Sequence, residues 1–517
     1  MGTGGRATMT DLRRESMSGV DTAWLRMDSP HNRMVIVGVM IFGGRLSLKR
    51  FRATLTERFL RFERFRQRPV LENGGAHWEE DADFDLARHV HRTALPGKAG
   101  TAELQAFTSE LASTALDPSK PLWEFHLVER FGKGSALVLR IHHCYADGIA
   151  LIRVLLAMAD DAPRPEGNGG GSAWWPTFAS SWFGWLSPIN SATSAIVRWS
   201  AAFWRRYFEL LGNPAKALDY AKIGTGLALE VGRLLTMSRE PDTRLRGAPG
   251  PVKQAAWAEP IPLADVKALG KQLTCSVNDV LLASAAGVLR AYLAHHGDDP
   301  DGVDIRVVVP VNLRPQDEGE ELGNKFGLVF LQLPVGVASP LERLFTVKRR
   351  MQALKTSAQP LLVLGLLEAA GSAPHFVQQL LADTLSAHAT AVMTNVPGPQ
   401  RALHLAGAEI TEQMFWVPQT GNIGLGASIL SYNGRVQFGL IADHKIMPDP
   451  DWVAQRFARE FEVLQKAAHA DAEADAAPRK RPAPRKKAAS ATAAAPKKRP
   501  TRRQRGKAPA PESGGAK

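Results

Sequence analysis

The stretch Ile141–Gly148, Ile-His-His-Cys-Tyr-Ala-Asp-Gly, stands between two apolar segments of different kinds. Residues 135–140 are rich in aliphatic side chains and predict a buried strand, whereas residues 149–156 predict a helix. The histidines therefore lie where a strand passes into a loop. Because neighbouring strand side chains point to opposite faces, one histidine is expected to be buried and structural while the other faces a cavity.

The two histidines, His142 and His143, carry the chemistry of this stretch. A rigidly held histidine with a pKa near neutrality can take a proton from a hydroxyl or thiol, as a general base does. Adjacent histidines seldom bind one ion, and the sequence offers no ligand cluster elsewhere, so no metal is expected. Cys144 is a nucleophile in principle, being beside a base. Without any further signature it is interpreted as a filler residue.

Asp147 has two interpretations that the residues alone leave open. Its carboxylate hydrogen-bonds a histidine, as in a catalytic triad, or it turns away and pairs with an arginine that locks the loop. Gly148 permits the tight turn in either case.

The pattern His-His-x-x-x-Asp-Gly resembles the motif of the CoA-dependent acyltransferase superfamily. This superfamily includes chloramphenicol acetyltransferase, peptide-synthetase condensation domains and the bacterial wax ester synthase/diacylglycerol acyltransferases. Because families with different donors and acceptors share the motif, other stretches decide among them. The chain resembles the last family in ordered segments from about Met17 to Ala468. These segments are 17–30, 84–90 with Trp78 before it, 121–123, 276–283, 307–315, 322–327 and 394–399.

The resemblance implies an α/β fold with two subdomains similar to the halves of chloramphenicol acetyltransferase. It further implies mixed sheets and an active-site tunnel between the subdomains that reaches His143 from both sides. The alternation of apolar strands with helices agrees with this class. The predicted parts are the motif-bearing subdomain (1–160), a linker with a Trp-rich segment (161–250), the second subdomain (251–470) and a disordered basic tail (471–517).

The resemblance also assigns the reacting groups. It implies that His143 is the general base and that acyl-CoA is a substrate, with no bound cofactor. The segment 276–283, Ser-Val-Asn-Asp-Val-Leu-Leu-Ala, is close to a second family hallmark, and either Ser276 or Asn278 would cap a helix there. Capping explains Asn278 together with Asp279 less well, so the resemblance assigns Asn278 to the active site as an oxyanion or substrate contact.

A structural role is implied for the rest of the motif. In the superfamily an arginine pairs with the motif aspartate, which makes Arg64 or Arg66 the expected partner of Asp147, with Arg314 as the alternative. Beneath the catalytic loop, a packing tryptophan is expected from the segment Pro-Leu-Trp. The residues expected to shape or support the loop are His142, Asp147, Gly148, Pro121 and Trp123.

The positive charge is concentrated at one end of the chain. The 517 residues are 44% hydrophobic with a net charge of +13, yet 478–517 holds 14 of the 64 Lys and Arg and one of the 51 Asp and Glu. The remainder is formally neutral and can bury at least two cores. The tail cannot bury enough apolar surface to fold alone. Its basic clusters suit anionic lipid headgroups, or nucleic acid without sequence preference.

Six of the 12 tryptophans lie between Trp174 and Trp204, where Arg198 is the single charged residue. Tryptophan favours the membrane interface, so this segment suits a lipid surface; a covering helix packed on the domain explains it equally. Neither a secretory signal nor a clean membrane-spanning helix is expected, and Cys144 and Cys275 suggest no disulfide. The expected location is cytoplasmic, peripheral on the inner membrane or on lipid inclusions.

The implied reaction is acyl transfer from acyl-CoA to diacylglycerol, giving triacylglycerol, or to a long-chain fatty alcohol, giving wax ester. Two other classes stay open. A carrier-dependent condensation-type acyltransferase is disfavoured because the sequence shows no carrier domain. A non-catalytic coat protein of lipid granules or nucleic acid is disfavoured because a scaffold has no need of a positioned base. The residues set neither the acceptor, nor the acyl chain length, nor the oligomeric state.

Overall fold

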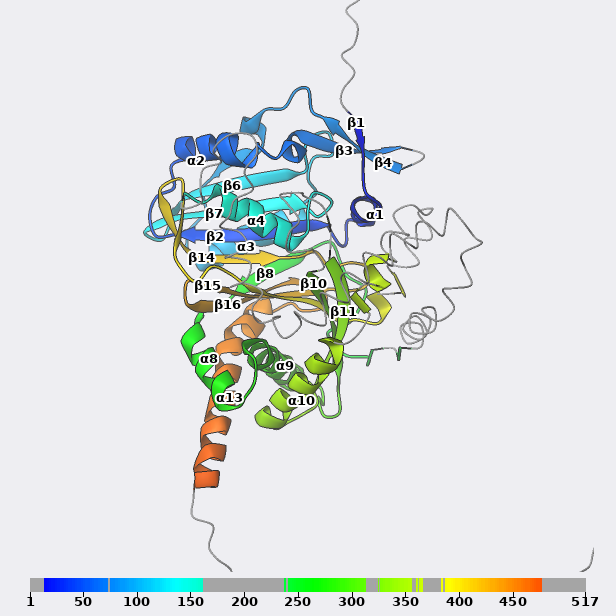
Figure 1. Ribbon diagram of the computed structural model, residues 1–517, viewed down its shortest axis with the longest axis vertical. Coiled ribbons are helices and arrows are strands. Elements are labelled where there is room, and N and C mark those ends of the chain that lie inside the picture. Colours follow the sequence, from blue (N-terminus) through cyan, green and yellow to red (C-terminus); the bar gives the residue numbers. More distant parts are fainter. Residues whose placement is uncertain are drawn as a thin grey trace, which may run out of the picture. The chain divides into compact units, whose positions relative to one another are not determined.

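Two mixed β-sheets and one small antiparallel sheet organise the described part of the chain (Figure 1). The alternation of strands and helices confirms the predicted α/β class with mixed sheets. The computed structural model describes residues 14–72, 75–160, 237–238, 240–312, 324, 326–355, 359–360, 362–365, 383–384 and 386–476.

The first sheet carries the histidine motif at the end of its strand β7. All neighbouring strands in it are antiparallel except β5 and β6. A hairpin joins β6 to β7, with Phe131 of β6 opposite Gly134 of β7. In order across the sheet, the strands are β13 (Leu403–Leu405), β14 (Ala408–Trp416), β2 (Val35–Phe42), β7 (Gly134–His142), β6 (Trp123–Phe131) and β5 (Val90–Thr93).

Strand β14 comes from the second half of the chain, yet it completes the first sheet. It pairs with β2, with Phe415 opposite Gly38 and Gln413 opposite Met40. The predicted subdomain of residues 251–470 therefore contributes β13 and β14 to the sheet of the N-terminal subdomain. Sheet membership and chain halves do not coincide in this fold.

The second sheet contains two parallel pairs, β10 with β12 and β12 with β15, and is otherwise antiparallel. Asn433 and Gly434, with φ of 48° and 75°, turn the chain between β15 and β16, as a tight hairpin loop requires. The strand order is β11 (Phe326–Leu333), β10 (Ile305–Asn312), β12 (Ala391–Pro397), β15 (Leu425–Tyr432), β16 (Arg435–Asp443) and β8 (Lys253–Trp257), while β9 (Ile261–Pro262) also pairs with β16.

The small third sheet is built from β1 (Arg14–Ser16), β4 (Gly75–Glu80) and β3 (Gln67–Glu72). Among the described helices, α9 is the one long and apolar enough to cross a membrane, and most of it is buried in the core below the second sheet. The helices are α1 (Gly19–Met27), α2 (Leu48–Thr54), α3 (Thr101–Ser113), α4 (Gly148–Met158), α8 (Leu263–Gln272), α9 (Val277–His295), α10 (Pro340–Lys355) and α13 (Pro450–Ala476).

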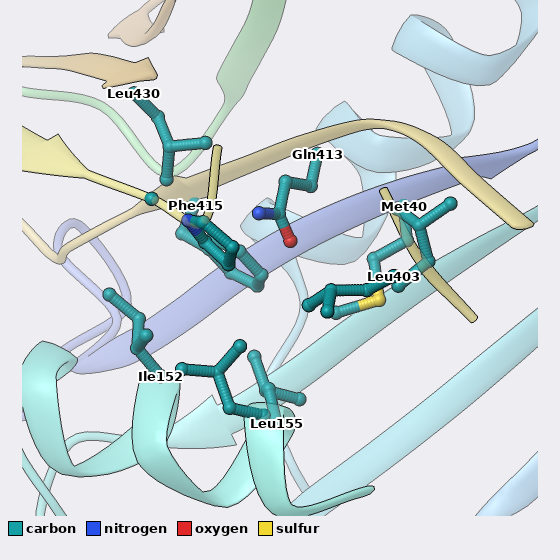
Figure 2. A pocket seen from close by; sticks show the side chains of 11 residues that line it. Met40, Ile152, Leu155, Leu403, Gln413, Phe415 and Leu430 are labelled. Carbon is teal, nitrogen blue, oxygen red and sulfur yellow. The ribbon is translucent and has the colours of Figure 1, made fainter. Parts of the chain in front are cut away.

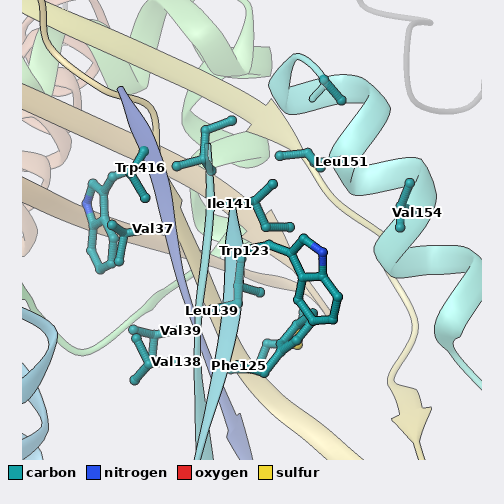
Figure 3. Packing of buried hydrophobic residues seen from close by; sticks show 14 of the residues in the cluster. Val37, Val39, Trp123, Phe125, Val138, Leu139, Ile141, Leu151, Val154 and Trp416 are labelled. Atoms are coloured by element: carbon teal, nitrogen blue, oxygen red, sulfur yellow. The ribbon is translucent and has the colours of Figure 1, made fainter. Parts of the chain in front are cut away.

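The core around the first sheet joins side chains from both halves of the chain (Figure 3). Trp416 of β14 lies beside Val37 of β2, and Leu151 and Val154 of α4 face Ile141 of β7. All five side chains are buried. This packing holds α4, and with it the loop that precedes α4, firmly against the sheet.

Three predicted features lie outside the described residues. They are the Trp-rich segment, the alternative arginine Arg314 and the basic tail from residue 477 onward.

Candidate active site

The loop between β7 and α4 is fastened at both of its ends. The backbone N–H of His143 donates to the Met34 carbonyl at 2.7 Å, which ties the loop to the segment leading into β2. At the other end the Asp147 carboxylate accepts from the Ala150 backbone N–H at 2.8 Å and thereby caps α4. An aspartate at this position satisfies a helix N–H that would otherwise lack a partner.

A buried tyrosine supports the loop from below. The Tyr145 hydroxyl accepts from the Leu122 backbone N–H at 2.9 Å and donates to the Gln67 carbonyl at 2.6 Å. Leu122 lies between Pro121 and Trp123, and Trp123 is fully buried. The Pro-Leu-Trp segment is thus connected directly to the motif loop.

His142 has the surroundings of a structural histidine. It is 3% exposed, and its Nδ1 accepts from the Cys144 backbone N–H at 3.2 Å, so the neutral ring carries its proton on Nε2. Nε2 lies 3.8 Å from Oδ1 of Asp28. Burial lowers the pKa of His142 to about 3. Burial likewise raises the pKa of the Cys144 thiol well above its usual range, which makes this cysteine a poor nucleophile.

His143 is enclosed by aromatic rings. Its ring centroid lies 4.4 Å from that of Trp24 and 5.6 Å from that of Phe326. Burial lowers the pKa of His143 to about 4, although the Asp147 carboxylate acts in the opposite direction. Nδ1 is buried without a hydrogen-bond partner among the described residues. The imidazole is therefore neutral at physiological pH and competent as a base.

Asn324 connects three distant segments at His143. Its Nδ2 donates to Oδ1 of Asp21 at 2.7 Å and to the backbone carbonyl of His143 at 2.9 Å. Two acceptors on one side fix which end of the amide is nitrogen. Burial raises the pKa of Asp21, and the hydrogen bond from Asn324 partly opposes that rise. The amide holds the backbone of the candidate base in place.

Asn278 lies in the first turn of α9. Ser276 Oγ accepts from the Asp279 N–H at 3.1 Å, and Asp279 Oδ2 accepts from the Ser276 N–H at 2.9 Å. This capping box accounts for Ser276 and Asp279 together. Asn278 Oδ1 accepts instead from Asn395 Nδ2 at 2.6 Å. No hydrogen bond joins Asn278 to His143 in the described part of the chain, so its oxyanion role stays a prediction.

The arginines expected beside Asp147 have other surroundings. Arg64 forms an ion pair with Glu15 at 3.0 Å and lies over the Trp78 ring at 4.5 Å, because the third sheet brings both residues to it. Nε of Arg66 is buried without a hydrogen-bond partner among the described residues. Within those residues neither arginine forms an ion pair with Asp147, in contrast to the expectation for Arg64 or Arg66.

A cluster with metal-ligand chemistry lies elsewhere, on strands β5 and β6. The ligand atoms of His91, Glu124 and His126 lie within 4.8 Å of one another. The Glu124 carboxylate, however, accepts from buried Arg140 at 2.9 Å and lies 3.1 Å from Nε2 of His126. Glu124 thus has a structural task in neutralising Arg140. The sequence did not reveal this cluster, because it depends on β5 pairing with β6.

Comparison with known proteins identifies the family. The model of the wax ester synthase/diacylglycerol acyltransferase catalytic domain matches residues 17–281, and the model of the WS/DGAT C-terminal domain matches residues 322–465. The chain belongs to the wax ester synthase/diacylglycerol acyltransferase family. The motif that carries His143 and the segment that carries Asn324 thus fall within separate matched domains of this family.

Individual relatives agree with this assignment. The chain is 27% identical over 413 residues to a Mycobacterium tuberculosis protein described as a probable diacylglycerol O-acyltransferase, covering 78% of this chain and 85% of the relative. It resembles the solved wax ester synthase/diacylglycerol acyltransferase of Marinobacter aquaeolei VT8 with a TM-score of 0.61, at 21% identity over 88% of this chain and all of that one. The starter condensation domain of rhizomide synthetase gives a TM-score of 0.53, at 14% identity over 88% and 94%. These structures show the shared fold.

Four residues that surround His143 in this family member were not singled out from the sequence. They come from two segments that the resemblance had already marked, 17–30 and 322–327. Nothing in the spacing shows that these segments meet at one histidine. The four residues are Asp21, Trp24, Asn324 and Phe326.

The pH dependence should reveal the buried base. Because the pKa of His143 is lowered to about 4, kcat/KM is expected to lack an acid limb at the ordinary histidine value of 6.5 and to fall only as the pH approaches 4. Rates of CoA release across this range check the expectation. A limb centred at 6.5 would contradict it.

The free energy of unfolding should decrease at low pH because of the low pKa values of His142 and His143. The unfolded chain takes up protons on His142 and His143 below pH 6.5, whereas the folded protein does so only near 3 and 4. Stability present above pH 6.5 is therefore lost as the pH falls, by up to about 1.4 kcal/mol per pH unit for each histidine. Urea unfolding at several pH values measures this slope.

Replacing Asn324 should impair turnover more than binding. Asn324→Ala removes the donor that holds the His143 carbonyl, and a small misplacement of the base is expected to lower kcat about 10- to 100-fold with little change in KM. Asp21→Asn retains an acceptor oxygen for Asn324 and should retain most activity. Equal losses in kcat for the two variants, or a loss confined to KM, would argue against this role for Asn324.

Proposed function

We propose that the protein transfers the acyl group of an acyl-CoA to the hydroxyl of a diacylglycerol or a long-chain fatty alcohol, with His143 as general base. The observation that carries the proposal is a neutral, buried histidine in a loop that is fixed by hydrogen bonds at its backbone N–H and carbonyl. The family of the chain supports the choice of substrates.

The reaction needs no acyl-enzyme. The acceptor oxygen attacks the thioester carbonyl while its proton passes to Nε2 of His143, giving a tetrahedral oxyanion and an imidazolium. The attack forms the new carbon–oxygen bond, and collapse of the intermediate restores the carbonyl and breaks the carbon–sulfur bond, which leaves the ester. The CoA thiolate leaves and takes the proton from the imidazolium. Asn278 is the candidate donor to the oxyanion, and a tunnel between the two halves is the expected route for both substrates.

Similar proteins support acyl-CoA as donor and diacylglycerol as one acceptor. The Mycobacterium tuberculosis relative is described as a probable diacylglycerol O-acyltransferase. The starter condensation domain of rhizomide synthetase was solved with C8-CoA, so this fold admits a CoA thioester in that protein.

The deciding experiment is CoA release by the purified protein from palmitoyl-CoA, with hexadecanol or a diacylglycerol as acceptor. Release that depends on the acceptor supports the proposal, and the ratio of the two rates gives the preference. Activity only with an acyl group on a carrier protein would instead favour the condensation-type reaction. A folded protein that releases no CoA, whichever acceptor is supplied, would point to a coat or scaffold role.

The proposal extends to the location, which is peripheral on the inner membrane or on lipid inclusions. The net positive charge of residues 478–517 supports it, since each basic residue near an anionic surface contributes about 1 kcal/mol of attraction. Nucleic acid is the competing ligand for the same charge.

Deletion of the chain after Ala477 should separate membrane attachment from catalysis. We expect unchanged activity on soluble substrates and reduced sedimentation with vesicles that contain phosphatidylglycerol. Vesicles of phosphatidylcholine alone are the control, and a DNA duplex tests the competing ligand. Vesicle binding that survives the deletion would remove the tail from this role.

A further inference from the structure

The two edges of the first sheet carry different chemistry. At the edge formed by β13 and β14, the side chains around a pocket are apolar apart from Gln413, as Figure 2 shows. At the opposite edge, β5 and β6 bring together two histidines and a carboxylate, which are His91, His126 and Glu124. Imidazole and carboxylate are ligands for divalent transition metals, so the β5 edge has a binding chemistry that the other edge lacks.

The register of the strands explains why these three side chains meet. Strands β5 and β6 are parallel, and His91 lies directly opposite His126. Glu124 precedes His126 by two residues, so both side chains leave the same face of β6. The two imidazole rings lie side by side, with their centroids 4.7 Å apart. The pairing of β5 with β6 thus places all three groups on one face.

The distances suit a tetrahedral metal ion. Zinc bonds of about 2.0 Å to nitrogen and oxygen place two ligand atoms about 3.3 Å apart. Nε2 of His126 and Oε2 of Glu124 already lie 3.1 Å apart. The ligand atoms of all three residues lie within 4.8 Å of one another. His91 therefore has to move by about 1.5 Å or less, which rotation of the ring about its broad χ2 torsion provides.

The nitrogen that His91 offers has no other use in the described part of the chain. Its Nε2 is buried there without a hydrogen-bond partner. A buried polar atom that makes no hydrogen bond costs free energy, and a bound metal ion would satisfy this one. The side chains of His126 and Glu124 are 12% and 22% exposed, so solvent reaches the cluster and water can supply a fourth ligand.

Arg140 holds the Glu124 carboxylate in place. Its Nη1 donates to Oε2 of Glu124 at 2.9 Å, and its Nη2 donates to the Thr114 carbonyl. A carboxylate has about four lone-pair sites, so Glu124 can accept from Arg140 and bind an ion at the same time. Hydrogen bonds to a ligand carboxylate are common in metal sites, because they orient it. The positive charge of Arg140 opposes that of the metal, and we therefore expect micromolar rather than tighter binding.

We infer that His91, Glu124 and His126 form a binding site for a zinc ion, with water as the fourth ligand. Strand β5 has four residues, and β6 is its single neighbour among the described strands. An ion shared by the two strands connects this short edge strand to the rest of the sheet and stabilises the folded state. The inference goes beyond the acyltransferase function and does not depend on it.

The test is calorimetric titration of the full-length protein with zinc chloride. The protein is prepared without a histidine tag, stripped with EDTA and exchanged into buffer without chelator. It should bind one zinc ion, and saturation should raise Tm by about 3 °C or more. His91→Phe and His126→Phe each keep an aromatic ring in the stacked pair but remove a ligand. Each should weaken zinc binding at least about ten-fold, because losing a hydrogen-bond partner of a ligand alone costs that much.

His77→Phe is the matched control. His77 is also a strand histidine whose buried Nε2 has no hydrogen-bond partner among the described residues, and it lies 3.9 Å and 3.8 Å from the carboxylates of Glu72 and Glu79. It lacks the second histidine, so this variant should bind zinc as the parent does. Magnesium chloride is the control for the ion, because Mg²⁺ prefers oxygen ligands.

Four results would overturn the inference. They are the absence of saturable zinc binding by the parent, unchanged binding in both cluster variants, an equal loss in His77→Phe, and equal binding of Mg²⁺. Zinc X-ray absorption of the parent needs no variant and therefore does not depend on how the variants fold. It should show two imidazole ligands and no sulfur, and a spectrum with fewer imidazoles would also reject the site.

Discussion

Replacing His143 with alanine is expected to lower kcat by a factor of about 10² to 10⁴, the contribution typical of a positioned general base. The variant loses the neutral imidazole of the candidate base, while the Trp24 and Phe326 rings that enclose it remain. No other group in the motif can replace it. His142 uses Nδ1 to accept from Cys144, and the buried thiol of Cys144 has a raised pKa.

The matched control for this variant is Cys144→Ala. If the reaction passes directly from acyl-CoA to the acceptor, this change should leave kcat within a few-fold of the parent. Single-turnover CoA release separates the chemical step from product release. Full activity in the His143 variant would reject His143 as the base. A loss in the Cys144 variant as large as that in His143→Ala would favour a covalent route.

The largest expected loss of stability lies far from the catalytic loop, at the pair Lys253 and Asp443. Their side chains are 4% and 0% exposed, with Nζ and Oδ2 2.9 Å apart. Asp443 also accepts from the backbone N–H groups of Gly250 and Lys445. Asp443→Ala leaves an uncompensated buried ammonium and two unpaired backbone N–H donors, which should cost about 3 to 5 kcal/mol.

Two comparisons sharpen that stability prediction. The double variant Lys253→Met/Asp443→Leu removes both charges together and should lose less than the single variant. Glu129→Ala breaks an exposed ion pair, in which the side chains of Arg92 and Glu129 are 65% and 39% exposed. This loss should cost less than about 1 kcal/mol. Urea unfolding of the three variants measures these differences. Equal losses for Glu129→Ala and Asp443→Ala would show that burial does not control the strength of these pairs.

Local patterns predicted the strand and helix that flank the motif, because their periodicity is contained in neighbouring residues. The hairpin from β6 to β7 follows from turn residues between two apolar runs. The predicted helix 149–156 corresponds to α4, which begins one residue earlier, at Gly148, and ends two residues later, at Met158. Helix ends depend on packing that a local pattern does not contain.

Long-range contacts explain what the sequence could not show at the site. Asn324 is separated by 303 residues from Asp21 and by 181 from His143. No periodicity links such positions. The surroundings of Arg64 have a related cause, because the third sheet brings Glu15 to this arginine. Asn278 was singled out partly because capping explained Asp279 poorly, yet the structure shows Asp279 closing a capping box.

Because β14 pairs with β2 from far along the chain, β2 lacks one of its neighbouring strands during most of synthesis on the ribosome. One edge of β2 stays unpaired until about 370 further residues have been added, which takes on the order of 20 to 70 s at typical rates of synthesis. Throughout that interval a long apolar strand offers open hydrogen-bonding groups to any neighbouring chain. The nascent first half therefore depends on protection from aggregation, and a chain truncated before residue 408 should be recovered mainly in the insoluble fraction.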